Sequence, residues 1–260
     1  MLFKYMYKHI IDIFKKMTKR VIIPDMHCNI EWVKNILKRE SPDIVIMLGD
    51  YFDSFDPDLY NNSPNSFKEL LKIKEDFIKE NGENSFITLL GNHDFHYLYD
   101  VLEQYSGFSW RLSGEISPLI NPEFEKHNLP IVYIDETNKI IFSHAGVTNT
   151  WMKDNNINSI YDINNTCFKY PNVLMFTYKN GGDMYGDSIS SSPIWVRPNS
   201  LLKDKVKDWV QVVGHTEYIT KNNNYYLKDN CYFIDNSQNA YMIQELDNNV
   251  LIDIKIKTIL

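Results

Sequence analysis

The stretch Arg20-Val21-Ile22-Ile23-Pro24-Asp25-Met26-His27 sets the pattern from which the fold can be predicted. An apolar run without alternation is typical of a strand that is buried on both faces. Here the run ends directly in an acidic residue and a histidine. A helix with an apolar stripe is expected next, capped by Asn29 and running to about Arg39.

The same unit repeats along the first third of the chain. Apolar runs at 43–48 and 86–90 predict two more strands, and a helix is expected at 67–81, ended by Asn81-Gly82, after a polar loop over 53–65. This β-α-β-α-β order implies parallel strands joined by right-handed crossovers. Ligands of such sheets bind at the carboxyl ends of the strands.

The rest of the chain is less regular. Runs at 131–134 and 140–143 flank a polar turn and predict a hairpin-like pair, whereas 150–200 is expected to be helix and long loop. Four later runs are expected to form a largely antiparallel second sheet: 210–213, 231–235, 240–243 and 250–256.

Five polar clusters follow apolar runs and contain four of the seven histidines: Asp25-Met26-His27, Gly49-Asp50-Tyr51-Phe52-Asp53, Gly91-Asn92-His93-Asp94, Ser143-His144-Ala145-Gly146 and Gly214-His215-Thr216. Mixed oxygen and imidazole donors suit manganese, iron or zinc better than calcium. The two oxygens of Asp50 can bridge two cations. The glycines before the ligands are expected to let the backbone turn sharply. The clusters therefore predict a site for two divalent metals.

Charge and cysteine content narrow the class of protein. The formal net charge of −7 argues against a basic groove for long nucleic acid. A small anionic substrate remains compatible, because bound dications reverse the local potential. The three cysteines Cys28, Cys167 and Cys231 are widely spaced and odd in number, which predicts no disulfide framework and a reducing, cytoplasmic setting. A reactive role for Cys28 is the alternative to simple burial.

Residues 1–18 form a basic amphipathic segment that precedes a single domain over 19–260. The segment is too short and too charged to span a bilayer, and it lacks the unbroken apolar stretch of a signal peptide. We expect it to pack on the domain or to be an upstream extension. Contact with a membrane surface is the alternative.

The order of the polar clusters resembles that of the calcineurin-like metallophosphoesterase superfamily over residues 20–217. Within it, Ser143-His144-Ala145-Gly146 and Ser192-Pro193-Ile194-Trp195-Val196-Arg197 resemble the phosphoprotein phosphatase branch. Bacterial and phage serine/threonine phosphatases and diadenosine tetraphosphatases are the most similar types. The resemblance implies an α/β fold, a four-layer αββα sandwich of two mixed sheets with the metals at strand carboxyl ends.

The resemblance also implies a role for each matching residue. The first metal would be held by Asp25, His27 and Asp50, and the second by Asp50, Asn92, His144 and His215. His93 would stand near the leaving group, oriented by Asp53. Arg197 and Asn92 would contact the substrate phosphate.

Two departures from the family pattern stand out. Some members carry a second histidine two places after the Gly-His pair, but this chain has Glu217 there, so water or Glu217 would complete the first metal site. The usual Asp-Arg-Gly is Asp53-Ser54-Phe55 here. The missing arginine would clamp a phosphate oxygen, so Arg197 is expected to carry more of that task, with Arg111 as a second candidate. His96 is expected on the helix after His93, with a place behind the site as the alternative.

These residues predict a metal-dependent phosphoric ester hydrolase with two divalent metals and a metal-bridging hydroxide. Manganese is the first choice of metal, and iron and zinc are alternatives. A phosphomonoesterase of the protein serine/threonine phosphatase type is the leading prediction, and its partner is a phosphorylated protein or nucleotide. The alternatives are a dinucleoside polyphosphate or other nucleotide hydrolase or phosphodiesterase, and a metal-binding scaffold or regulatory module without turnover.

Overall fold

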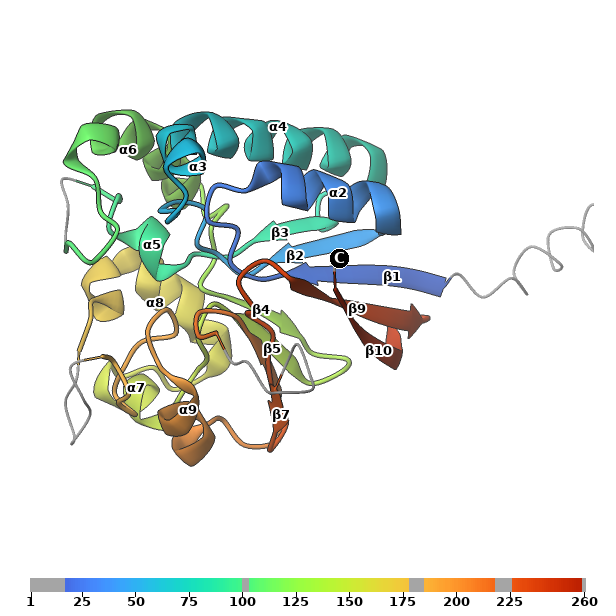
Figure 1. Cartoon of the computed structure of the whole chain (residues 1–260). Coiled ribbons are helices and arrows are strands. Elements are labelled where there is room, and N and C mark those ends of the chain that lie inside the picture. The colour runs from blue at the N-terminus through green and yellow to red at the C-terminus, as the bar shows by residue number, and fades with distance from the viewer. Residues whose placement is uncertain (1–16, 100–102, 178–184, 218–225, 259–260) are drawn as a thin grey trace, which may run out of the picture.

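The computed structural model describes residues 17–99, 103–177, 185–217 and 226–258, and it places them in two β-sheets flanked by helices (Figure 1). The predicted N-terminal extension lies outside the described residues except for Met17 and Thr18, which open the first strand. None of the helices within these ranges is both long and apolar enough to cross a membrane.

The first sheet contains the parallel strands that the sequence predicts. Its strands are β1 (Met17–Ile23), β2 (Ile44–Met47), β3 (Phe86–Thr88), β9 (Ala240–Asp247) and β10 (Val250–Thr258). They lie in the order β10-β9-β1-β2-β3, and β1, β2 and β3 are mutually parallel. The prediction that the last two runs join the second sheet is wrong. Strand β9 pairs antiparallel with β1 and so covers an edge that would otherwise be open.

The second sheet contains β4 (Val132–Asp135), β5 (Ile140–Ser143), β6 (Val210–Val213), β7 (Tyr226–Lys228) and β8 (Cys231–Phe233) in the order β4-β5-β6-β8-β7. The antiparallel pairing of β4 with β5 confirms the predicted hairpin. Strand β6, however, is parallel to both β5 and β8, so this sheet is mixed rather than largely antiparallel. Parallel neighbours need a long crossover, and the helical segment between β5 and β6 provides it.

The helices are α2 (Ile30–Glu40), α3 (Pro57–Asn61), α4 (Ser63–Asn81), α5 (Asn92–Phe95), α6 (Trp110–Glu125), α7 (Asn149–Asp154), α8 (Ile163–Lys169) and α9 (Pro198–Asp204), with 3-10 turns η1 (Ile160–Asp162) and η2 (Pro171–Leu174). Asn29 caps α2 by accepting from the Trp32 N–H at 3.1 Å, as predicted. The predicted loop over 53–65 is instead mostly helical. Pro57 and Pro64 occupy the first turns of α3 and α4, where proline is tolerated because no N–H partner is needed.

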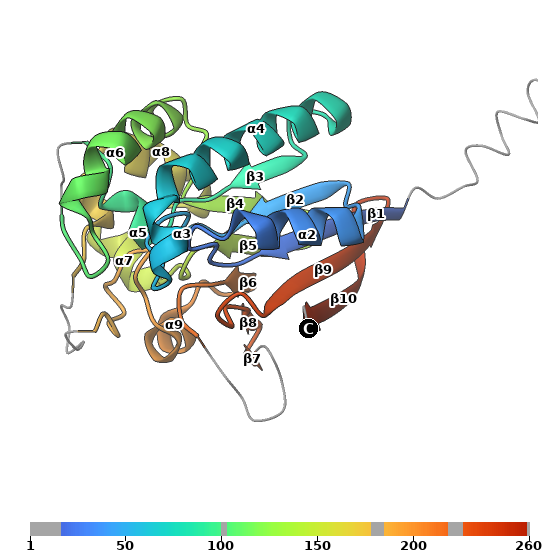
Figure 2. The same cartoon turned by 45° about the horizontal axis from the view of Figure 1, so that its top comes forward.

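The elements stack as four layers, which confirms the αββα sandwich (Figure 2). Helices α2 and α4 cover the outer face of the first sheet (Figure 1). On the outer face of the second sheet, Leu201 of α9 packs against Val213 and Phe233. Apolar side chains from both sheets meet between them, among them Ile22, Ile46, Met242, Phe142 and Val212. The inner strands β1, β2, β5 and β6 are therefore largely buried on both faces, and polar residues follow their carboxyl ends.

Candidate metal centre

The predicted metal ligands all follow the carboxyl ends of strands. Asp25 and His27 follow β1, Asp50 follows β2, Asn92 begins α5 just after β3, His144 follows β5 and His215 follows β6. Because parallel strands of a sheet end at one edge, these positions converge. Five of the six line a cavity of about 270 Å³, namely Asp25, His27, Asp50, Asn92 and His215, and His144 is fully buried behind them.

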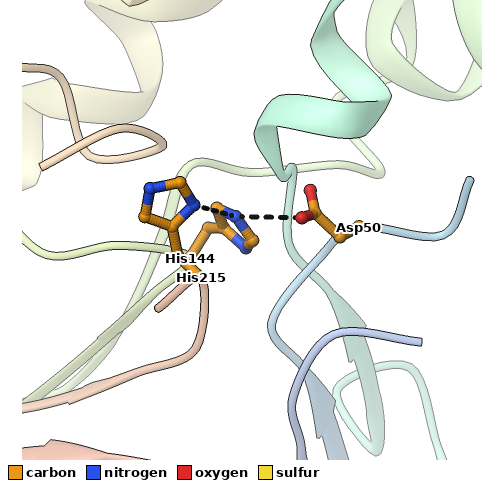
Figure 3. A group of neighbouring side chains, drawn as sticks. All are labelled: Asp50, His144 and His215. Carbon is orange, nitrogen blue, oxygen red and sulfur yellow. Dashed lines mark hydrogen bonds and ion pairs between the residues drawn. The ribbon is translucent and has the colours of Figure 1, made fainter. Parts of the chain in front are cut away.

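The first group of converging ligands consists of Asp50, His144 and His215 (Figure 3). His144 Nε2 lies 3.4 Å from Asp50 Oδ2 and 3.2 Å from His215 Nδ1. The side-chain oxygen of Asn92 lies 2.8 Å from the same His144 nitrogen and 2.9 Å from His215 Nδ1. Two imidazoles, an amide oxygen and a carboxylate therefore face one point.

The second group consists of Asp25, His27 and Asp50. His27 Nε2 lies 4.0 Å from Asp50 Oδ2, the same oxygen that faces His144. The carboxylate of Asp25 accepts from the His215 N–H at 3.0 and 3.1 Å, which ties this group to the first one. Asp50 is shared by both groups, and its predicted role as a bridge between two cations stays a prediction.

The protonation of two of these histidines follows from their backbone contacts. The Leu48 carbonyl oxygen lies 2.9 Å from His144 Nδ1, and the Phe52 carbonyl oxygen lies 3.1 Å from His27 Nδ1. A carbonyl can only accept, so Nδ1 carries a proton, and in the neutral ring Nε2 then keeps its lone pair. In His144 this lone pair faces a carboxylate oxygen of Asp50. Two acceptors in this arrangement repel each other unless a cation lies between them, so the residues fit a metal ion.

The electrostatics of the cluster favour a bound cation as well. Burial raises the pKa of Asp50 well above its usual range, and the charges of Asp25 and Asp94 raise it further. Burial also lowers the pKa of His144 to about 4 and lowers the pKa of His215 well below its usual value. The imidazoles of His144 and His215 are therefore neutral and able to ligate, while the neighbouring carboxylates bring several negative charges close together.

A fully buried carboxylate fixes the loop that carries Asp50. Asp94 Oδ2 accepts from the backbone N–H groups of Asp50 and Gly91, both at 2.8 Å, and Oδ1 accepts from the Tyr51 N–H at 2.7 Å. Burial raises the pKa of Asp94 to about 7. This clamp between two strand ends was missed in the sequence, where Asp94 was only the last residue of a motif.

Several residues of the predicted site have strained backbone conformations. His27, Asp50, Asp53 and His215 have φ angles of +42°, +52°, +60° and +64°. Left-handed conformations are uncommon for residues other than glycine, and they concentrate at functional sites. The hydrogen bonds around these loops offset the free energy of the left-handed conformations and hold the side chains toward the cavity.

Two of the three glycines before the predicted ligands are needed for close packing against a carboxylate, and one is needed for a sharp turn. Gly49 has a φ of +109°, as expected for a sharp turn. A Cβ on Gly91 would lie 2.2 Å from Asp50 Oδ1, and one on Gly214 would lie 2.2 Å from Asp25 Oδ1. Neither of these two has a left-handed φ. The predicted reason therefore holds for Gly49, whereas Gly91 and Gly214 leave room for the ligand carboxylates.

His93 and Asp53 form a pair beside the metal ligands. His93 Nδ1 lies 2.9 Å from Asp53 Oδ2, and the Tyr97 hydroxyl donates to Asp53 Oδ1 at 2.7 Å. Burial would raise the pKa of Asp53, but its contacts with His93 and His96 outweigh burial and hold that pKa below its usual value. The carboxylate therefore stays ionised, and it fixes the His93 ring with Nε2 free.

His96 does not continue the helix after His93. Helix α5 ends at Phe95, and His96 turns inward, fully buried, with Nε2 2.6 Å from Asp53 Oδ2. Its ring stacks against Tyr105. The contact with Asp53 is an ion-pair distance without hydrogen-bond alignment. The structure thus places His96 behind the site, which was the alternative expectation.

Three residues were expected to compensate for the departures from the family pattern, and only one of them lines the cavity. Arg197 lines the cavity, and its guanidinium donates from Nε to the Tyr185 carbonyl oxygen at 2.5 Å and from Nη1 to Thr216 Oγ1 at 3.3 Å. Arg111 instead donates to the Asn61 side chain and does not line the cavity. Glu217 is exposed and is also absent from the cavity lining.

One acidic residue was missed in the sequence, and none of the three cysteines lines the cavity. Asp235, which the sequence analysis did not single out, lines the cavity; its place at the end of the run 231–235 was the available signal. The three cysteines are free and buried. Burial raises the pKa of Cys28 to about 12, so its thiol does not ionise near neutral pH and a reactive role is unsupported.

Comparison with known proteins identifies the family and agrees with the fold. A family model described as calcineurin-like phosphoesterase matches residues 18–250. Among solved structures, a serine/threonine phosphatase from Saccharomyces cerevisiae with similarity to human phosphatase PP5 is similar at a TM-score of 0.56 and 12% identity, covering 94% of this chain and 80% of that one. A metallophosphoesterase from Sphaerobacter thermophilus is similar at a TM-score of 0.53 and 14% identity, covering 94% and 89%. No curated protein matches the sequence.

Proposed function

The chain belongs to the calcineurin-like phosphoesterase family, and from that membership we propose that it is a phosphomonoesterase that works with two divalent metal ions. Membership makes the chain a hydrolase. The observation that carries the two-metal proposal is the position of Asp50, which belongs to both groups of converging ligands. One carboxylate at the boundary of two ligand groups is suited to bridge two cations.

The proposed ligands divide as the sequence analysis expected. Asp25, His27 and Asp50 would hold the first metal, and Asp50, Asn92, His144 and His215 would hold the second. Oxygen donors with imidazole and no thiolate suit manganese, and they also accept iron and zinc. Metal ions bound there would act as Lewis acids on the phosphoryl group and would lower the pKa of the attacking water.

The side chains around the ligands would handle the rest of the reaction. Attack of water on phosphorus forms one P–O bond while the ester P–O bond breaks, and the leaving oxygen needs a proton. In its protonated form His93 would donate that proton from Nε2, because Asp53 holds the proton on its Nδ1, and the proton released by the attacking water would restore the ring. Arg197, at the cavity wall, would hold a non-reacting phosphate oxygen.

The proposed function is tested by stripping the protein of metal and supplying paired chromogenic phosphate monoesters and diesters. We expect no turnover without metal and monoester turnover when manganese, zinc or iron is returned, with manganese the most effective. A marked diester preference would replace the proposal with a phosphodiesterase or nucleotide hydrolase. Bound metal without any turnover would favour a scaffold. Restored monoester turnover would justify comparing phosphopeptides with dinucleoside polyphosphates.

Replacing Arg197 with lysine should raise the KM for a phosphate monoester by about tenfold while kcat changes little. Lysine keeps the charge but loses the fork of a guanidinium, and a charge-assisted hydrogen bond contributes roughly 1.5–3 kcal/mol. Steady-state kinetics measure both constants. Arg111→Lys is the matched control, since Arg111 contacts Asn61 outside the cavity. An equal rise in KM in both variants would refute the assignment of Arg197.

A further inference from the structure

Asp235 lies beside a metal ligand because of the strand register. Strands β6 and β8 are parallel, with Val213 opposite Phe233, and the Ile234 N–H donates to the Val213 carbonyl oxygen at 2.9 Å. His215 lies two residues after Val213, and Asp235 lies two residues after Phe233. Neighbouring strands lie about 4.8 Å apart, so the register brings Asp235 next to the backbone that carries His215.

The same backbone contacts Asp25. The carboxylate of Asp25 accepts the His215 N–H, and Asp25 and Asp235 both line the cavity. Burial raises the pKa of Asp235 to about 8, and the nearby charge of Asp25 contributes to that rise. The two carboxyl groups therefore line the same cavity, and the charge of Asp25 acts on Asp235.

The turn after Asp235 is fastened to the loop that carries Asp25 and His27. Gln238 Nε2 donates to the Met26 carbonyl oxygen at 2.9 Å, and Gln238 Oε1 accepts from Asn29 Nδ2 at 2.7 Å. Gln238 adopts a left-handed φ of +62° to make these contacts. This cross-connection fixes Asp235 relative to the first metal position.

Asp235 also lacks a positive partner. Its side chain is 8% exposed, and Oδ1 accepts from the Ser237 N–H at 3.2 Å. Within the described part of the chain, no lysine, arginine or histidine forms an ion pair with it. A buried carboxylate without a positive partner is costly, and a cation in the cavity would offset that cost.

We propose that Asp235 is a further acidic ligand of the metal position formed by Asp25, His27 and Asp50. The proposal rests on the proposed two-metal function and deepens it. Asp235 would complete the first metal site. Glu217, which the sequence analysis considered for this role, is exposed and does not line the cavity. With three carboxylates and one imidazole, this position is an oxygen-rich site, which favours manganese over zinc.

The test is a titration of the metal-stripped full chain with Mn²⁺, in which the electron paramagnetic resonance signal of free Mn²⁺ gives the number of sites and the affinity of each. The wild type should bind two ions. Asp235→Asn keeps an acceptor for the Ser237 N–H but removes the charge, and it should weaken one site by at least about tenfold and leave the other unchanged. Thermal melting checks the fold, and Asp235→Ser is titrated in the same way if the asparagine variant is unfolded.

Glu217→Gln is the control, because it removes a negative charge that acts on Asp235 from outside the cavity lining. It should change neither affinity by more than about twofold, since exposed charges are screened. Two unchanged sites in Asp235→Asn, or an equal loss in Glu217→Gln, would overturn the role of Asp235 and leave the proposed function standing. A wild type that binds no Mn²⁺, zinc or iron would overturn both.

Discussion

Asp50→Asn should lower phosphomonoester turnover by about 10³-fold or more and should weaken the binding of both metal ions. Asp50 belongs to both ligand groups, and its Oδ2 faces His144 at 3.4 Å and His27 at 4.0 Å. An asparagine has no negative charge and cannot bridge two cations as a carboxylate does. A loss of roughly 4 kcal/mol in transition-state stabilisation corresponds to about three powers of ten in rate.

The asparagine variant is expected to fold. Asn keeps an oxygen that can accept the His93 N–H, which Asp50 Oδ1 accepts at 2.9 Å. Asn also tolerates the left-handed φ of +52° at this position. Asp208→Asn is a matched control, because Asp208 is exposed and has a φ of +62°. Metal content by plasma mass spectrometry and turnover by a chromogenic assay give the result. Two retained metals with more than about a tenth of wild-type turnover would refute the shared-ligand role.

Local sequence patterns were sufficient to predict those strands and helices that are marked by their own apolar pattern and capping residues. The apolar run at 20–24 and the capping residue Asn29 predicted β1 and α2, and the parallel order of β1, β2 and β3 followed from the alternation of strands and helices. The convergence of the ligands then followed from the fold, because the carboxyl ends of parallel strands share one edge. The chemistry of the site could thus be expected before its geometry was known.

Long-range pairing could not be predicted in the same way. An apolar run such as 240–243 does not specify the edge on which it will pair, and β9 joins β1 through contacts such as Arg20 opposite Gln244. The inward turn of His96 has a similar cause. Spacing of three residues places His93 and His96 on the same side of the turn, and both do contact Asp53 Oδ2. That this carboxylate would lie there, with His96 fully buried behind it, depends on the fold and not on the spacing. Asp235 was missed because its significance depends on the register of β8 with β6.

His93→Ala should leave both metals bound and should lower turnover by about 10²–10⁴-fold for a substrate with a poor leaving group. The ring of His93 contacts Asp53 rather than the shared oxygen of Asp50, and its backbone N–H to Asp50 survives in alanine. The alkoxide oxygen of an alkyl phosphate must be protonated as it leaves, whereas the nitrophenolate of a nitrophenyl phosphate leaves without a proton. The loss should therefore be much smaller for a nitrophenyl phosphate.

The difference between the two substrates separates proton donation from simple positioning. If His93 only stabilised the charge of the phosphoryl group, its removal would lower the turnover of both substrates by a similar factor, because their phosphoryl groups are alike. His127→Ala is the control, since it removes an exposed imidazole that stacks on Phe168 outside the cavity lining. Equal losses for both leaving groups would exclude His93 as the acid. A preserved rate with both metals in place would remove His93 and Asp53 from the chemistry altogether.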